Sequence, residues 1–322
     1  MGRRAAAYVK GALMPIALLF PGQGSQFSGM GKELHEEFPV AKAVFDEASD
    51  ALSQDMAALC FNGTEEELRL TENTQPAIFT VSVAAFRALK EETGVAPLCA
   101  AGHSLGEYSA LTAAGVLSLK EAVRVLRLRG RYMQEAVPVG KGAMAAIIGL
   151  LPEKIEEACR AASSIGIVSP ANYNGGGQVV ISGEAKAVEA ACEAAKAAGA
   201  RKVIPLQVSG PFHCELMRCA AERLAPEIEA MSLGSAGFPV VANVTAAAYR
   251  EEEAVDLLTR QVVSPVRWEE SVRVMKEMGA TAFLEIGPGK VLSSLVKRIE
   301  KDLAAAFFCG KADMDAVAAI LR

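Results

Sequence analysis

The sequence predicts an α/β protein whose main sheet is parallel and covered by helices on both faces, and two observations support this class. Short apolar runs of strand length alternate with longer segments of helical periodicity along most of the chain. Continuous apolar runs, without alternation of polar residues, are typical of parallel strands buried on both faces. The expected strands of this sheet are residues 16–20, 98–101, 239–244, 282–286 and 304–309.

Helix starts between these strands are marked by capping residues. Thr64 and Ser118 are each followed three residues later by a glutamate, Glu67 and Glu121, which is the spacing of a capping box. Pro76 is expected in the first turn of a helix, where its missing N–H costs nothing.

The pattern changes between residues 138 and 209. Here we expect a strand, a helix, two strands, a helix and a strand, over residues 142–150, 153–162, 166–171, 178–182, 185–198 and 202–208. The order βαββαβ is that of a ferredoxin-like module. Because the first pattern resumes afterwards, we predict a large α/β domain over 14–137 and 210–322, with a small domain inserted at 138–209. The cleft between the two would be a natural place for a site.

Composition and charge exclude several classes of protein. Of the 322 residues, 51% are hydrophobic and 22% are charged, as expected of an ordered globular protein. The formal net charge is −5, so there is no general basic field, and we expect neither nucleic acid nor an anionic membrane as a partner.

The seven cysteines are scattered, odd in number and never spaced as Cys-x-x-Cys. This excludes a disulfide framework and favours a reducing cytoplasm. The nearest approach to a ligand cluster is His213, Cys214 and Cys219, whose irregular spacing does not predict a metal site.

The first residues need separate treatment. Arg3 and Arg4, followed by the apolar run 12–20, imitate a signal peptide, but Pro15 interrupts the run and no cleavage site follows. No apolar run approaches the roughly 18 residues of a membrane span. We therefore expect residues 1–13 to be a loose extension.

A Gly-x-Ser-x-Gly sequence, Gly102-His-Ser-Leu-Gly106, lies between a predicted strand and a predicted helix. In that context the pattern is a nucleophile elbow, in which glycines permit a sharp bend and expose the serine hydroxyl at the edge of the sheet. A chance match to this short pattern remains the alternative. Two other glycine turns, at 22–24 and 287–289, fit neither a dinucleotide-binding nor a phosphate-binding loop.

A serine nucleophile needs a base, and the chain has three histidines. His35 lies beside Glu36 and Glu37 and is expected to be solvated, and the backbone of His103 is committed to the elbow. His213 is expected to open a helix, where the helix dipole disfavours protonation and keeps the imidazole ready to accept a proton. The alternative is a histidine with only a structural role at the helix entry.

Arg129 falls on the apolar stripe of the helix predicted to follow Ser118. An uncompensated buried charge costs about 3 to 5 kcal/mol, and no acidic residue shares the stripe. Either a distant acid approaches Arg129, or a carboxylate arrives with the substrate. The planar guanidinium suits the second task because it binds a carboxylate through two hydrogen bonds.

Together these features resemble one family, the malonyl-CoA:acyl-carrier-protein transacylases of fatty acid synthesis, which are related to the acyltransferase domains of polyketide synthases. The similar segments span nearly the whole chain from Met14 onward in the expected order: residues 20–26, 102–108, 129–130, 142–146, 172–174, 178–181, 212–213, 260–261 and 285–289. The resemblance implies a hydrolase-like large domain with a ferredoxin-like insertion.

The resemblance also implies roles for individual residues. It places the acyl ester on Ser104, the base at His213 and the substrate carboxylate on Arg129. Backbone N–H groups of Gln23 and Leu105 would form the oxyanion hole.

Four further positions match the family. At Gln261 a main-chain carbonyl would steady the histidine, so that no aspartate is needed. Asn172 and Asn174 match a segment that lines the cleft, and the bulky ring of Phe212 would reject a branched methylmalonyl group.

The expected reaction is transfer of malonyl from malonyl-CoA to Ser104 and then to the phosphopantetheine thiol of acyl carrier protein, without a metal or other cofactor. The enzyme is expected to be a cytoplasmic monomer. Three alternatives stay open: a trans-acting polyketide acyltransferase, a serine hydrolase or thioesterase, and a noncatalytic protein that docks the carrier.

Overall fold

The fold is described from a computed structural model over residues 15–138, 140–208 and 210–321. The predicted extension, residues 1–13, lies outside the described residues. So do Val139 and Ser209, near the two predicted ends of the insertion. The exact division of the chain at 138 and 209 stays a prediction.

The main sheet has five parallel strands in the order β7-β2-β1-β8-β9. They are β1 (Ile16–Phe20), β2 (Cys99–Gly102), β7 (Val240–Val241), β8 (Ala282–Ile286) and β9 (Ala304–Phe308). The central strand is β1, where Leu18 pairs with Ala100 on one side and with Leu284 on the other. The predicted parallel α/β sheet is confirmed.

Both faces of this sheet are covered, which is why its strands are predominantly apolar. Leu18 and Phe20 belong to the apolar cluster on one face, and Ala17 and Leu19 to the cluster on the other. The first cluster includes side chains of α1 (Lys32–Glu37), α2 (Pro39–Leu52), α3 (Met56–Asn62), α4 (Glu65–Arg69), α5 (Thr71–Thr93), α6 (Gly106–Ala114), α7 (Leu119–Glu135), α10 (Arg218–Glu229), α11 (Ala254–Gln261) and α14 (Met314–Ile320). The second includes α12 (Trp268–Glu277) and α13 (Val291–Ile299).

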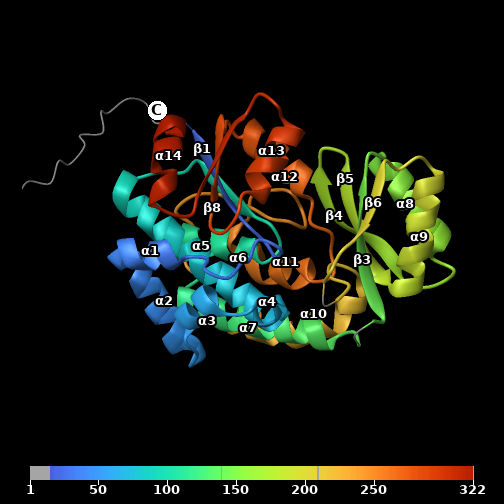
Figure 1. The fold of residues 1–322 in the computed structure, drawn as a ribbon, viewed down its shortest axis with the longest axis horizontal. Coiled ribbons are helices and arrows are strands. Elements are labelled where there is room, and N and C mark those ends of the chain that lie inside the picture. The colour runs from blue at the N-terminus through green and yellow to red at the C-terminus, as the bar shows by residue number, and fades with distance from the viewer. Residues whose placement is uncertain (1–14, 139, 209, 322) are drawn as a thin grey trace, which may run out of the picture.

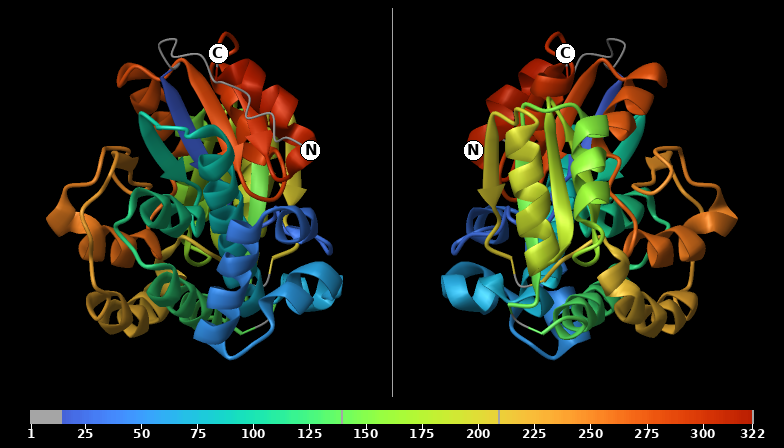
Figure 2. Two further views of the ribbon diagram at one scale, coloured as in Figure 1. Left: turned by 90° about the vertical axis from the view of Figure 1, so that its left-hand side faces the viewer. Right: turned by 90° about the vertical axis from the view of Figure 1, so that its right-hand side faces the viewer.

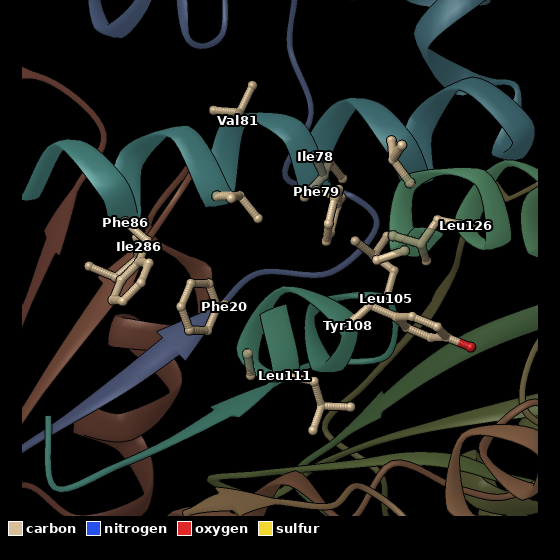
Figure 3. Packing of buried hydrophobic residues seen from close by; sticks show 14 of the residues in the cluster. Phe20, Ile78, Phe79, Val81, Phe86, Leu105, Tyr108, Leu111, Leu126 and Ile286 are labelled. Carbon is tan, nitrogen blue, oxygen red and sulfur yellow. The ribbon is translucent and has the colours of Figure 1, made fainter. Parts of the chain in front are cut away.

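The longest helix, α5, lies over the elbow helix α6 and the end of β1. Figure 3 shows Phe20 beneath α5, beside Phe86 and Ile286. The rings of Phe20 and Phe86 meet edge to face, with centroids 6.2 Å apart. This packing fixes the end of β1 against α5.

A second sheet is antiparallel and has the strand order β4-β5-β3-β6. Its elements are β3 (Gly142–Ile148), α8 (Pro152–Ala162), β4 (Val168–Gly175), β5 (Gln178–Glu184), α9 (Ala185–Ala197) and β6 (Lys202–Pro205). The observed βαββαβ order confirms the predicted ferredoxin-like insertion. Figure 1 shows it at the right of the molecule, and the right-hand view of Figure 2 shows α8 and α9 in front of their sheet.

The edge strand β4 of the antiparallel sheet is joined to the rest of the chain through its backbone. Tyr173 N–H donates to the Val266 carbonyl at 2.9 Å, and Val266 N–H donates to the Ala171 carbonyl at 2.8 Å. Val266 lies two residues before α12, so these bonds tie β4 to a segment that packs against the parallel sheet.

Several predicted bounds are corrected. The strand expected over 239–244 is only two residues long. β7 pairs with β2, and the chain then turns back at Ala246, which has φ 51° and is bonded to the Ala242 carbonyl. The strand expected to reach residue 208 ends at Pro205, and β4 runs to Gly175 instead of residue 171.

Two smaller predictions are also wrong. Pro76 is not in the first turn of its helix, because α5 has its N-cap at Leu70 and begins at Thr71. His35 is half-buried rather than solvated, since its ring packs edge to face on Phe45 and Phe61, with centroids 5.6 and 5.3 Å away. The described part of the chain has no helix that is both long and apolar enough to cross a membrane.

Candidate active site

Ser104 stands on the sharp turn that joins β2 to α6. Its backbone has φ 53°, a left-handed conformation that residues other than glycine adopt rarely. A Cβ on Gly102 would lie 1.9 Å from the Gly106 carbonyl carbon and oxygen, and one on Gly106 would lie 2.2 Å from the Phe20 carbonyl oxygen. Both glycines are therefore required by close backbone contacts, as the elbow pattern predicts.

Asn243, which follows β7, stabilises this turn through its side chain. Its Oδ1 accepts from the Ser104 N–H at 2.8 Å, and its Nδ2 donates to the Gly102 carbonyl at 2.7 Å. A role for this completely buried residue is not predicted from the sequence. It is the only polar side chain in the run 239–244, and that could have singled it out.

His213 contacts the serine hydroxyl, with 2.8 Å between Nε2 and the Ser104 Oγ. Its Nδ1 lies 2.9 Å from the carbonyl oxygen of Gln261 and 3.1 Å from that of Ser264. Because carbonyl oxygens only accept hydrogen bonds, Nδ1 must carry the ring proton. The free lone pair on Nε2 therefore faces the hydroxyl, ready to accept its proton.

Burial keeps the imidazole neutral. The His213 pKa is lowered to about 3, first by burial and then by the positive charge of Arg129. The predicted neutral state agrees, but the predicted cause does not. His213 does not open a helix: Cys214 separates it from a short 3₁₀ turn at Glu215–Met217 that leads into α10. Instead it has φ 60° in a loop.

Arg129 projects from α7 and is only 1% exposed. Nη1 donates to the Gln75 side-chain oxygen at 2.7 Å, and Nη2 donates to the Gln261 side-chain oxygen at 2.9 Å and to the Ser104 hydroxyl at 3.1 Å. Within the described ranges Arg129 forms no ion pair. The hydrogen-bond acceptors around its guanidinium are neutral oxygens. An acidic side chain in contact with Arg129, the first of the two expected sources of an anion, is not found among the described residues.

Ser104, His213 and Arg129 open into one pocket of about 150 Å³. Gln23, Asn172 and Phe212 also line it. The Gln23 side chain donates to the Thr71 hydroxyl at 3.3 Å.

The remaining predicted residues lie outside this lining. Leu105 is buried in the core with its backbone at the start of α6, and Gln261 lies behind Arg129 at the end of α11. Asn174 lines a neighbouring hollow of about 220 Å³, where its Oδ1 is 3.0 Å from His103 Nε2. The His103 ring is thus held by Asn174 and by contact with Trp268, whose ring centroid is 5.6 Å away.

Three further polar residues complete the site. Gln75 anchors Arg129, while Glu107 and Tyr249 join the side chain of Gln261 in a buried network. Sequence reasoning missed all three. Gln75 and Glu107 are buried polar residues in helices that are buried over most of their length, and helical periodicity alone does not single them out.

A group of three or more His, Cys, Asp or Glu side chains that could hold a metal ion is not found among the described residues. Cys214 is buried beneath the loop, whereas Cys219 is exposed on α10, so the two do not converge with His213.

A serine that can pass its proton to a neighbouring histidine is the feature shared by serine hydrolases and acyltransferases. The buried cation of Arg129 lies beside it, 3.1 Å from the serine hydroxyl. This chain belongs to the family described as acyl transferase domain, whose model matches residues 17–318.

Individual members make the relationship more specific. The chain is 52% identical over 290 residues to a malonyl CoA-acyl carrier protein transacylase of Bacillus subtilis, which covers 89% of this chain and 91% of the relative. A crystal structure of an acyl carrier protein S-malonyltransferase from Vibrio cholerae superposes with a TM-score of 0.92 at 46% identity, over 94% of this chain and 99% of that one.

A malonyl-transacylase solved in complex with its type II PKS acyl-carrier protein is also similar. The TM-score is 0.91 and the identity 50%, over 95% of this chain and 98% of that one.

Proposed function

We propose that this chain is an acyl-carrier-protein S-malonyltransferase that moves malonyl from malonyl-CoA to the phosphopantetheine thiol of acyl carrier protein, supplying fatty acid synthesis. The observation that carries the proposal is the Arg129 guanidinium, 3.1 Å from the hydroxyl of Ser104. Relatives that share about half of their residues with this chain are malonyl CoA-acyl carrier protein transacylases, which supports the choice of acyl group and acceptor.

In the first half-reaction the Ser104 Oγ attacks the thioester carbonyl while His213 Nε2 takes the hydroxyl proton. The 2.8 Å contact between these two atoms is within the range that proton transfer requires. The negative charge that develops on the carbonyl oxygen would be stabilised by the backbone N–H groups of Leu105 and Gln23. Cleavage of the C–S bond releases the CoA thiol, which receives the proton from His213, and leaves a malonyl ester on Ser104.

The second half-reaction runs the same steps in reverse order with a new thiol. The carrier's thiol gives its proton to His213, its sulfur attacks the ester carbonyl, and Ser104 regains its proton as the C–O bond breaks. One base therefore serves both thiols, and bonds are exchanged only between thioester and ester, so the proposed reaction uses no metal or other cofactor.

Arg129 supplies selectivity for an acyl group with a free carboxylate. Its two anchored nitrogen atoms leave a cation that no acidic side chain contacts in the described part of the chain. A malonyl carboxylate would compensate this charge in a buried place, where the interaction is strongest. Phe212, only 7% exposed in the pocket, would exclude a methyl branch on the same acyl group.

Several accompanying properties belong to the proposal. Malonyl-CoA is the donor, the enzyme acts as a monomer, and its compartment is the cytoplasm. The seven cysteines support the last point, because all are free thiols and five are buried. A polyketide carrier as acceptor would use the same chemistry, as the similar transacylase in complex with a type II PKS carrier illustrates.

Intact-protein mass spectrometry tests the proposal. Mixing the protein with malonyl-CoA is expected to add one malonyl group, which peptide mapping places on Ser104 and which moves to holo acyl carrier protein when that is added. Acetyl-CoA should label far less. The absence of a malonyl adduct would overturn the proposal.

A second arm of the same experiment removes the cation. Arg129→Ala should lower the rate of malonyl labelling on the order of 10²–10³-fold, since a buried carboxylate without its partner costs about 3 to 5 kcal/mol. Acetyl labelling should change little. Arg131→Ala is the matched control, because Arg131 lies on the same helix but is exposed and paired with Glu72. Retained preference for malonyl in Arg129→Ala would contradict the carboxylate-binding role.

A further inference from the structure

Glu107 is a fully buried carboxyl group at the second residue of α6, three positions after the nucleophile. No basic side chain pairs with it among the described residues. The proposed chemistry does not use it. A buried acid without a cation is costly unless its oxygens are hydrogen-bonded, so its partners show what it is for.

Those partners are all donors. Oε1 accepts from the Asn243 backbone N–H at 3.1 Å and from the Tyr249 hydroxyl. Oε2 accepts from the Gln261 side-chain amide nitrogen. Burial is the largest influence on the Glu107 pKa and raises it to about 7, while these hydrogen bonds and Arg129 act in the opposite direction.

The contact with Gln261 decides which way the Gln261 amide points. Its Nε2 faces the Glu107 carboxyl and the Ser104 carbonyl, 2.9 Å away. Its Oε1 consequently faces Arg129 Nη2 at 2.9 Å. An inverted amide would set an oxygen against two acceptors and an NH₂ group against a guanidinium, so all three contacts would become repulsive.

Arg129 depends on this orientation, because only two side-chain oxygens other than the nucleophile hold it within the described structure, those of Gln75 and Gln261. Loss of the Gln261 oxygen would leave Nη1 bonded to Gln75 and Nη2 bonded to the Ser104 hydroxyl alone, so the guanidinium would be less firmly placed. A misplaced cation would no longer meet the carboxylate of an acyl group on Ser104.

We propose that Glu107 is a positioning residue that sets the Gln261 amide and, through it, places the Arg129 guanidinium for recognition of the malonyl carboxylate. The inference rests on the proposed function and adds to it a determinant of selectivity that touches neither substrate nor nucleophile side chain.

Glu107→Gln is the sharpest variant, because it conserves shape and replaces one acceptor by a donor. Its NH₂ group must face either the Asn243 N–H or the Gln261 NH₂, and both are donors. The second conflict is relieved by rotation of the Gln261 amide, which then presents its NH₂ to Arg129.

The experiment compares kcat/KM for acylation of Ser104 by malonyl-CoA and by acetyl-CoA. For Glu107→Gln we expect the malonyl-to-acetyl ratio to fall at least about tenfold, with the acetyl value within a few-fold of wild type. In an Arg129→Ala background the same substitution should not lower the ratio further. Glu107→Asp, a shorter acceptor, should give an intermediate ratio, and it decides the question if Glu107→Gln does not fold.

Glu285→Gln is the matched control. Glu285 is also a buried carboxyl, but it accepts from the Ser293 N–H at the start of α13, away from Arg129. The malonyl-to-acetyl ratio of Glu285→Gln should therefore equal that of wild type. Equal losses for both substrates in Glu107→Gln, or an unchanged ratio in a folded Glu107→Gln or Glu107→Asp, would overturn the inference. Failure of wild type to form a malonyl ester would instead overturn the proposed function, and the inference with it.

Discussion

The two walls of the active-site pocket are built from different kinds of residue. The wall on the parallel sheet carries Ser104 and Arg129, both joined to other side chains by short hydrogen bonds. The wall on the antiparallel insertion contributes Met144, Asn172 and Leu206, which have no charge. In the proposed reaction, one wall therefore performs the chemistry and the other encloses it.

The difference has a physical basis in how each wall is anchored. Side chains on the parallel-sheet wall emerge from a turn and from helices that are packed into the main core, so their positions are fixed from several sides. The insertion has its own core, around Ile147, Ile155 and Ile181. It meets the main core through side chains of its other sheet face, such as Met144 and Val180, and through the backbone bonds of β4 to Val266.

The largest effect is expected at the reacting pair. Ser104→Ala and His213→Ala should each lower kcat by about 10⁶-fold, and the double variant should be no slower, because the two side chains act as one unit. The measurement is malonyl transfer to holo acyl carrier protein at saturating malonyl-CoA. Ser109→Ala, which alters a buried serine on α6, the helix after the elbow, should retain activity. Additive losses in the double variant would break the picture of a single reacting unit.

A pH profile sharpens the role of burial on the same wall. A base must be neutral to accept a proton, and the His213 pKa is lowered to about 3, so acylation by acetyl-CoA should be nearly constant from pH 6 to pH 5. A histidine of ordinary pKa 6.5 would lose most of its neutral form over this range, a fall of about eightfold.

Arg129→Ala serves as the comparison for this profile. Removing the guanidinium takes away the second cause of the lowered His213 pKa, so the acid limb of the profile should move to higher pH. The charged and titratable neighbours of His213 that lower its pKa are Arg129 and His103. A wild-type profile that falls with an apparent pKa near 6.5 would mean that the imidazole is accessible to water.

The smallest effect on rate is expected on the insertion wall. Asn174→Ala removes the acceptor 3.0 Å from His103 and leaves a buried ring nitrogen unpaired, which costs about 1 to 3 kcal/mol in the free energy of unfolding. The transfer rate should change by less than about tenfold. Chemical denaturation and the transfer assay measure the two quantities. A loss of rate near that of His213→Ala would place essential chemistry on this wall as well.

The fold could be predicted from the sequence where local pattern and burial agree. The bounds of β1 and β8 match the prediction because both are largely apolar runs with strands on both sides. β7 was overestimated because its length is limited by pairing with β2 and by the turn at Ala246, neither of which hydrophobicity records.

Prediction of the site follows a similar division. Ser104 and His213 were found because motif and elimination single them out, and Arg129 because a cation interrupts an apolar stripe. Asn243 and Glu107 were not, since their partners lie more than 100 residues away in the chain and only the folded arrangement brings them together. The cause of the His213 pKa shift was missed for the same reason.

At Ser104 and His213, the two residues of the reacting pair, the backbone conformation lowers the stability of the fold. Both have positive φ, where a side chain costs about 1 kcal/mol relative to glycine. Replacement of Ser104 by glycine would thus relieve backbone strain and remove the nucleophile. A directed-evolution campaign that rewards heat resistance alone would drift towards an inert protein at Ser104, so selection for thermal tolerance needs acyl transfer as a simultaneous requirement.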